Sequence, residues 1–292
     1  MEIQLSNVLT DKAQDITVLT NSTQFGKIEN EQSIHGINLL FTIAGVGATA
    51  AEIVTDIADI RVKYNGELII NRSADELLDL YKYRFDKYGA FTVAGVVPII
   101  FKRNDLMAEG LAKGYSLGMV DSNGRMAGLV VEVDYKAVVL AVTKCELHYE
   151  YDLRPARDVA GKGNGIGKHV RQLRYPKNWP TASLQDIADL PRSKAGVSAI
   201  AYHFSKATLS HLTVHANSNA IINNTHLNII NRQLDQAGRT PQTGYVHLDF
   251  SKENDENALL PVSSLHRFVV SALWTTKPDD YLILADELHP GL

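Results

Sequence analysis

The sequence predicts a mainly β protein built from two tandem β-sandwiches, each with a short helix after its first hairpin. Two observations predict this fold class. A stretch of hairpin and helix signals in the first half occurs again in the second half, and both halves contain many short apolar segments separated by turn residues. The length of 292 residues suits two domains of ordinary size.

The repeated stretch runs over Ile60–Leu78 in the first half and Leu212–Ile230 in the second. Aligned without gaps, the two copies match at Val62 and Val214, Asn65 and Asn217, Ile69-Ile70-Asn71 and Ile221-Ile222-Asn223, Ser73 and Thr225, and Leu77-Leu78 and Ile229-Ile230. A chance match between two hairpin-helix units in a β-rich chain is the alternative. The same order of expected elements in both halves favours duplication of one fold.

Each copy combines a two-residue turn with a helix start. Asn65-Gly66 is a strong hairpin signal, because a type I′ turn needs positive φ at both central residues. Ser73 and Glu76 have the spacing of a capping box, in which each side chain bonds a free amide of the first helical turn. The second copy offers the weaker turn Asn217-Ser218, and Thr225 as the hydroxyl N-cap.

The remaining strands are predicted from apolar runs and alternation. Strands are expected at 34–44, 90–102, 129–135 and 138–151 in the first half, and at 197–206, 245–251, 267–274 and 281–285 in the second. Pro98 cannot donate a hydrogen bond to a β-ladder, so its strand should lie at an edge or contain a bulge or break.

These elements divide the chain into four parts. Residues 1–33 are polar with only short apolar pairs, and we expect an N-terminal arm that is not part of a core. The first sandwich is expected at 34–153 and the second at 181–292, with a Gly-rich basic linker at 154–180 between them.

The composition argues against several classes of protein. The net charge of −4 is mild, so it gives no reason to expect specific binding to nucleic acid or a membrane surface. The single cysteine, Cys145, allows no intrachain disulfide and fits folding in a reducing cytoplasm. We expect no signal peptide, and no segment that is long and apolar enough to span a membrane.

The glycine-rich run Gly161–Lys168 matches a phosphate-binding loop poorly. A Walker A loop requires Ser or Thr directly after its Lys, but His169 follows Lys168. Lys162 also occupies the position where the first Gly of that motif should stand. A flexible linker is the better interpretation.

The sequence shows no arrangement of catalytic residues. The histidines are scattered, and His211 and His215 are expected on a strand, where they do not share a helical turn. Cys145 falls on the apolar side of an alternating strand and is expected in the core. The acidic pairs Asp279-Asp280 and Asp286-Glu287 are expected to be solvated, with a structural Ca²⁺ as the alternative. We therefore predict a binding or structural protein and not an enzyme.

Several segments resemble one known family. They are Ile57–Leu68 at the first hairpin, Gly95–Phe101 at the strand after the first helix, and Asp186–Arg192 with Val197–His203 at the entry into the second sandwich. These segments are similar to those of the double jelly-roll major capsid proteins of corticoviruses, which are tailless icosahedral bacteriophages with an internal membrane. The resemblance extends from about Ile34 to the C-terminus.

The resemblance implies two tandem eight-stranded jelly rolls and a role in the virion capsid. It implies homotrimers that form pseudo-hexagonal capsomers of the icosahedral shell, after synthesis in the host cytoplasm. The implied partners are neighbouring trimers, penton or spike proteins and membrane-associated virion proteins, and no cofactor is implied. The alternative function is a tandem β-sandwich that binds carbohydrate or another ligand, which would require a concave face with exposed aromatic rings.

Overall fold

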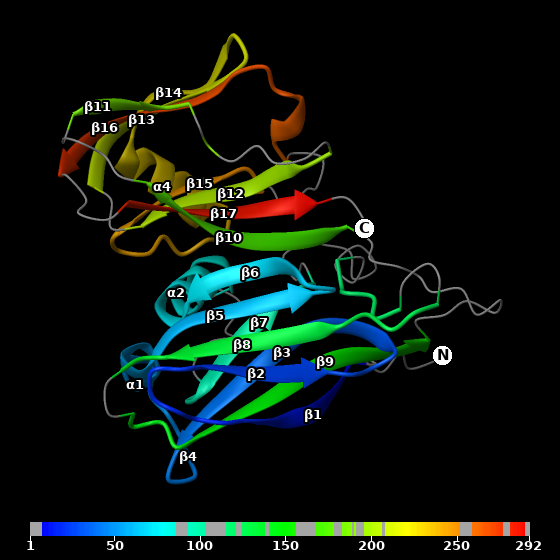
Figure 1. The fold of residues 1–292 in the computed structure, drawn as a ribbon. Helices are drawn as coiled ribbons and strands as arrows, with labels where there is room; N and C mark the ends of the chain where they lie inside the picture. The colour runs from blue at the N-terminus through cyan, green and yellow to red at the C-terminus, as the bar shows by residue number, and fades with distance from the viewer. Residues whose placement is uncertain are drawn as a thin grey trace, which may run out of the picture. The chain divides into compact units, whose positions relative to one another are not determined.

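The computed structural model describes residues 8–85, 93–102, 115–120, 124–137, 140–155, 168–177, 183–188, 190, 196–205, 208–251, 259–276 and 281–289. Contacts within the chain define two compact units. Unit 1 contains the described residues of Met1–Tyr81 and Phe91–Val170, and unit 2 contains those of Lys82–Ala90 and Arg171–His289. Figure 1 labels the strands and helices of both units.

Unit 1 is a sandwich of two antiparallel sheets. Its strands are β1 Val8–Ile16, β2 Thr23–Ile28, β3 Gln32–Ile43, β4 Val46–Gly47, β5 Ile57–Tyr64, β6 Glu67–Ser73, β7 Val96–Ile100, β8 Leu129–Tyr135 and β9 Lys144–Pro155. One sheet has the order β1-β9-β3-β4, with β7 also paired to β3. In the other sheet, β8 lies between β2 and β5, and β5 pairs with β6.

Unit 2 is also built from two sheets. Its strands are β10 His169–Lys177, β11 Leu184–Ile187, β12 Ser198–Ser205, β13 Thr208–Ala216, β14 Asn219–His226, β15 Tyr245–Asp249, β16 Phe268–Thr276 and β17 Tyr281–His289. One sheet contains β15, β12, β17 and β10 in this order, and the other contains β11, β16, β13 and β14.

Both units connect their strands in the same order. The strands of each unit can be counted in chain order, leaving out the two-residue strand β4. The first, eighth, third and sixth strands of each unit then form one sheet. The second, seventh, fourth and fifth strands form the other. This is the arrangement of an eight-stranded jelly roll. The prediction of two tandem eight-stranded jelly rolls is therefore confirmed.

A helix follows the first hairpin of each copy, as predicted. The helices are α2 Ala74–Phe85 and α4 Leu227–Gln236, and the residues of α2 from Lys82 onward belong to unit 2. A shorter helix, α1 Ala50–Asp56, precedes β5 and starts with a capping box between Thr49 and Glu52. Within the described ranges, no helix has the length and apolar character that a membrane crossing needs.

Alternating side chains build a separate core in each unit. In unit 1, β8 buries Leu129, Val131 and Val133, which pack in one cluster with Cys145. The corresponding cluster of unit 2 includes Val214, Tyr202, Phe268 and Val270. Burying one such side chain contributes about 1.5–3 kcal/mol to folding, so these rows of residues stabilise each sandwich.

The expectation that residues 1–33 form an arm outside the core is wrong for the part that the structure describes. Strand β1 pairs with β9 and strand β2 pairs with β8, so the segment supplies the first two strands of the first jelly roll. Ile16 and Ile28 are buried in its core. Most other side chains of β1 are exposed, which explains why the segment has a polar composition.

The prediction of a linker at 154–180 is also wrong for the residues that the structure describes. Strand β9 continues to Pro155, and β10 occupies His169–Lys177 as the first strand of the second jelly roll. His169, Val170 and Arg171 are buried. This strand was not predicted, because the basic and other polar side chains of the segment obscure the alternation of apolar residues. The residues from Gly161 to Gly167 lie outside the described ranges.

The position of Pro98 agrees with its chemistry. Pro98 lies in β7 opposite Asn38 of β3. Among the described strands, β7 pairs with β3 alone, so the prediction of an edge strand is confirmed. A proline can occupy such a strand because its missing N–H can fall on the unpaired side.

Candidate functional site

The first hairpin has the turn that the sequence predicts. Asn65 and Gly66 have φ angles of 49° and 82°, as a type I′ turn requires. The turn is also fixed to the start of β8. The N–H of Asn65 donates to the carbonyl of Gly128 at 2.8 Å, and the N–H of Gly128 donates to Oδ1 of Asn65 at 2.8 Å.

The second hairpin repeats this connection with other residues. Asn217 has a φ of 55°, and its N–H donates to the carbonyl of Arg267 at 2.7 Å. Its Oδ1 accepts from the N–H of His266 at 2.9 Å and of Arg267 at 3.3 Å. In both units, the turn asparagine thus binds backbone groups next to the seventh strand. Sequence reasoning identified the turns and missed these long-range contacts.

The cap of the first helix is predicted correctly and that of the second is not. Glu76 accepts from the N–H of Ser73 at 2.9 Å, and Ser73 Oγ accepts from the N–H of Glu76 at 3.2 Å, which completes the capping box. In the second copy, His226 is the N-cap, and its Nδ1 accepts from the N–H of Asn228 at 3.1 Å. Thr225 donates its hydroxyl to the carbonyl of Asn223 instead.

An extra residue in β14 explains the error at Thr225. In the first hairpin Ile60 is opposite Arg72, whereas in the second Leu212 is opposite Thr225, one position later than the ungapped alignment requires. The additional residue forms a bulge near Asn224, which has a φ of 43°. A bulge moves every later residue by one position, so the cap passes from the threonine to the histidine.

The remaining candidate residues do not form a reactive site. Cys145 is buried as predicted, and burial raises the pKa of its thiol to about 12. His211 faces His226 across two strands, with ring centroids 5.1 Å apart. In the described part of the chain, no group of three or more histidine, cysteine or acidic residues is arranged to hold a metal ion.

The acidic pair at the end of the chain is not solvated. Asp286 and Glu287 are buried in β17, which contradicts the expectation of exposed carboxylates. Asp286 pairs with Arg84 at 2.8 Å, and Glu287 pairs with His289 at 2.9 Å. The guanidinium of Arg84 thus neutralises Asp286, and the ring of His289 is a polar partner of Glu287. Asp279-Asp280 lies outside the described residues.

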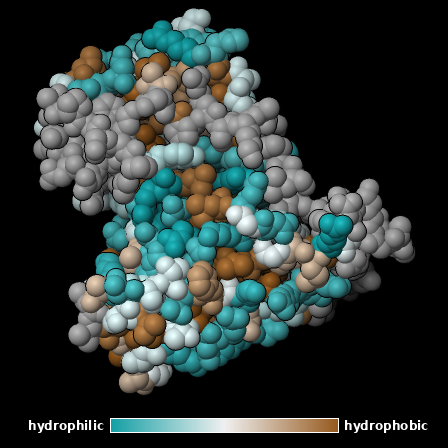
Figure 2. All heavy atoms as spheres, in the orientation of Figure 1, coloured by the Kyte–Doolittle hydropathy of each residue, from teal (hydrophilic) through white to brown (hydrophobic). Residues whose placement is uncertain are grey.

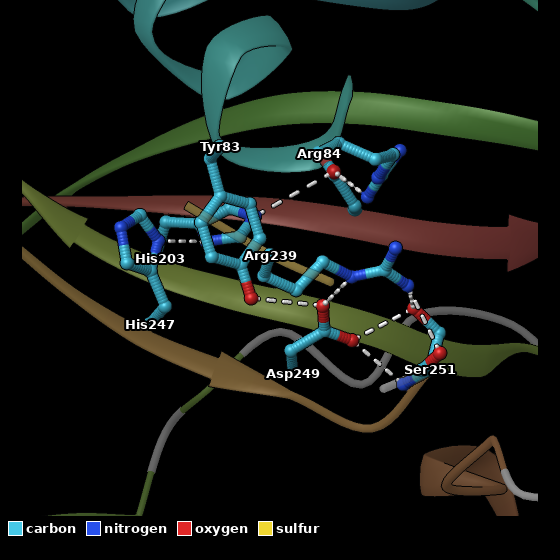
Figure 3. A network of polar contacts seen from close by, with 8 residues as sticks. Tyr83, Arg84, His203, Arg239, His247, Asp249 and Ser251 are labelled. Atoms are coloured by element: carbon cyan, nitrogen blue, oxygen red, sulfur yellow. Dashed lines mark hydrogen bonds and ion pairs between the residues drawn. The ribbon is translucent and has the colours of Figure 1, made fainter. Parts of the chain in front are cut away.

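A buried polar network in unit 2 was not predicted. At its centre, Asp249 of β15 accepts from Tyr83 Oη at 2.9 Å and from Arg239 Nε at 3.1 Å (Figure 3). The other oxygen of Asp249 accepts from the N–H and the hydroxyl of Ser251, both at 2.7 Å. Arg239 also donates to the carbonyl of Ser251 at 3.0 Å. Each of these side chains is buried, so the bonds replace those that water would provide.

A histidine pair lies beside this centre. Nδ1 of His203 and Nδ1 of His247 are 2.8 Å apart, and the ring of Tyr83 stacks on His247 with a centroid distance of 4.0 Å. Gln242 donates its N–H to Nε2 of His247 at 3.2 Å, so neutral His247 carries its proton on Nδ1. That proton is donated to His203, whose own proton is then on Nε2, 3.7 Å from Asp286 Oδ2. One backbone amide thus sets the tautomers of both rings.

Burial and neighbouring charges shift the pKa values in this network. Burial raises the pKa of Tyr83 well above its usual range, and the negative charge of Asp249 adds to this. Burial, followed by His203, lowers the pKa of His247 well below its usual range. Burial would raise the pKa of Asp249, but the charges of Arg239 and Arg84 outweigh it and the pKa is lowered. The network therefore holds an ionised aspartate next to neutral rings.

The sequence contains only a misleading signal for this network. Tyr245–Ser251 alternates strictly, which predicts one buried face and one solvent face for β15. His247 and Asp249 fall on the polar side of that pattern, yet they are buried together with Tyr83 and Arg239. The end of α2 and the loop after α4 supply these covering residues, and sequence periodicity does not report such contacts.

The two units differ at equivalent positions of one sheet. In unit 1, Arg61 pairs with Glu132 at 2.8 Å, and Lys63 pairs with Glu132 at 2.6 Å. The same register in unit 2 places Thr213 opposite Ser271. The position that carries an ion pair in unit 1 is therefore uncharged in unit 2.

One hollow of unit 1 has no aromatic ring in its lining. It is lined by residues 27–29 and 126–130. Trp274 is buried in the core of unit 2. On the face seen in Figure 2, hydrophobic residues are interspersed among hydrophilic ones.

Comparison with known proteins agrees with this architecture. Residues 170–286 match the family model described as viral coat protein P2 C-terminal domain. The match covers most of the second jelly roll. A search of curated protein sequences with the chain finds no match.

The whole chain is similar in fold to solved capsid proteins. Against the major capsid protein P2 from bacteriophage PM2, the TM-score is 0.81 at 16% identity, and 98% of each chain is covered. Against the Faustovirus major capsid protein, the TM-score is 0.65 at 7% identity, with 100% of this chain and 92% of the other covered. Against the PBCV-1 virus capsid, the TM-score is 0.64 at 11% identity, with 98% and 94% covered.

The turn of the first hairpin can be tested with two glycine substitutions. Gly66→Val should lower the free energy of unfolding by about 1–2 kcal/mol, because a side chain is strained at a φ of 82° even though the space around it is open. Gly128→Ala is the control, since its position is equally open and has no positive φ, and it should change stability by less than about 0.5 kcal/mol. Urea denaturation measures both. Equal stabilities of the two variants would contradict the assigned turn.

The network can be tested by neutralising its aspartate. Asp249→Asn leaves the buried guanidinium of Arg239 without its counter-charge, so we expect a loss of about 3–5 kcal/mol in the stability of unit 2. Asp186→Asn is the matched control, because Asp186 is exposed and accepts a bond from Ser271. Thermal unfolding should show a large decrease for the first variant alone. A loss below about 1 kcal/mol would show that the ion pair is dispensable.

The histidine pair predicts sensitivity to acid. The folded chain holds the pKa of His247 below the value of about 6.5 that it has when unfolded, so the unfolded chain binds this proton more readily. Stability should therefore decrease as the pH falls from 7.5 to 5.5. His247→Gln should show a smaller decrease over the same interval, measured by urea denaturation. Identical pH dependence in the variant and the original chain would refute the role of His247.

Proposed function

We propose that this chain is the major capsid protein of an icosahedral virion and that it assembles as a homotrimer. The observation that carries the proposal is the double jelly roll itself, which matches the PM2 major capsid protein over 98% of both chains. The coat-protein match of residues 170–286 supports the same role. Both observations favour a structural protein over an enzyme.

The duplication has a physical use in such a shell. Three chains with two similar domains each place six similar bodies around one axis, which approximates the six-fold symmetry of a flat lattice. Contacts between different surfaces of identical chains close into a ring when their rotation closes. Differences between the two copies, such as the ion pair of Arg61 and its uncharged counterpart Thr213, would let neighbouring contacts differ.

The polar network of unit 2 fits a structural role. Its ionised and hydrogen-bonded groups are buried, and they bind one another, so no substrate has access to them in this arrangement. A buried ion pair adds little net stability, because the cost of removing two charges from water offsets their attraction. The lack of an aromatic ring in the hollow at residues 27–29 and 126–130 disfavours the carbohydrate-binding alternative.

The wider assembly follows from the same proposal. Trimers would contact neighbouring trimers in the lattice and penton or spike proteins at the vertices. Membrane-associated virion proteins would be partners on the inner side, over an internal membrane. Synthesis would take place in the host cytoplasm before assembly, and the proposal requires no cofactor.

The oligomeric state tests this function. Size-exclusion chromatography with light scattering on the purified chain should give three times the chain mass of 32.2 kDa. Interfaces of stable assemblies bury upward of about 2,000 Å², so the trimer should persist at micromolar concentration. A monomer at that concentration, with measurable affinity for a glycan, would favour the ligand-binding alternative.

A further inference from the structure

Strands β1 and β14 are two of the strands that lie at the ends of the described sheets. Strand β1 ends one sheet of unit 1 and pairs with β9, and strand β14 ends one sheet of unit 2 and pairs with β13. An edge strand presents N–H and C=O groups that lack a partner, so it favours the addition of another strand.

Strand β14 is open where its counterpart in unit 1 is covered. Ile69 in β6 and Ile221 in β14 occupy equivalent bulge positions. Ile69 directly precedes Ile70, which pairs with Val62, and Ile221 directly precedes Ile222, which pairs with Val214. Ile69 is 0% exposed, whereas Ile221 is 45% exposed. No side chain of β6 is exposed, but most side chains of β14 are.

Strand β1 shows the same contrast with its counterpart β10. The side chains of Leu9, Thr10, Asp11 and Lys12 are exposed, and Leu9 is 39% exposed. In β10, none of the side chains that the structure describes is exposed. Each unit therefore has one open edge strand whose counterpart in the other unit is covered.

The composition of β14 indicates that its edge is meant to be covered. Edge strands that must stay free usually carry lysine, other charges or proline. The sequence of β14, Asn-Ala-Ile-Ile-Asn-Asn-Thr-His, has none of these, whereas β1 carries Asp11, Lys12 and Asp15. Ile229 in the helix that follows is also exposed.

We propose that β14 of one copy packs against β1 of the next copy, and that this contact joins the chains of the trimer. It rests on the proposed function, because it needs a closed ring of copies. One open strand in each unit gives two different surfaces, as a heterologous contact requires. Repeated three times, the contact would cover Leu9 and Ile221 in every chain.

Engineered cysteines can test which strands meet. One variant carries Leu9→Cys and Ile221→Cys in the same chain, and a second carries Asp11→Cys and Asn223→Cys, to allow for the register. Mild oxidation should give covalent dimers and trimers on a denaturing gel, with nothing larger, for at least one of them. The native Cys145 does not interfere, because it is buried and its pKa is raised to about 12.

The controls separate this contact from other arrangements. Val46→Cys combined with Ile221→Cys should not cross-link, because Val46 belongs to neither β1 nor β14. Val46 is a suitable control because it is 71% exposed. Single Ile221→Cys should remain one chain in size. Covalent dimers from that single variant would overturn the proposal, because they would show that β14 meets β14 about a two-fold axis.

A charge substitution provides an independent test that does not depend on the register. Ile221→Lys should convert the trimer to a monomer with an unchanged unfolding transition, while Val46→Lys stays trimeric. If the original chain is a trimer and Ile221→Lys is equally trimeric, the β14–β1 contact is wrong and the proposed function stands. If the original chain is itself a monomer, the proposed function fails as well.

Discussion

The constraint on which the rest of the structure depends is that every open β-sheet ends in strands with unpaired backbone groups. A jelly roll wraps eight strands into two sheets and still leaves such edges. In this chain β6 and β10 have no exposed side chain among those described, whereas β1 and β14 do. Each unit thus has one edge strand, β1 or β14, that is open where its counterpart in the other unit is covered, and both would be covered if the copies form a ring.

The two units share one topology and differ in their chemistry. Both units use a turn asparagine, Asn65 or Asn217, to bind backbone groups next to the seventh strand, so this connection is common to the two. The ion pair of Arg61 and Glu132 has no charged counterpart in unit 2. Unit 2 instead buries an ionised Asp249 with its partners on a strand whose sequence suggests an open face.

Local signals were predictable from the sequence, and long-range ones were not. The turn at Asn65-Gly66 and the capping box of Ser73 depend on neighbours within a few residues, so their sequence patterns suffice. The cap at Thr225 was wrong, because one bulge residue shifts the second copy by one position. Strands β1 and β10 were missed, since their exposed or basic side chains obscure the alternation that a core-facing strand normally shows.

An experimental structure of the assembled protein, by crystallography or cryo-electron microscopy, tests the central claim most directly. That claim is that one folded unit, present twice in each chain, lets three chains fill six places around an axis. The account predicts a three-fold assembly in which Ile221 of each copy is buried against β1 of the next. A two-fold dimer, or a trimer in which both β1 and β14 remain solvent-exposed, would contradict it.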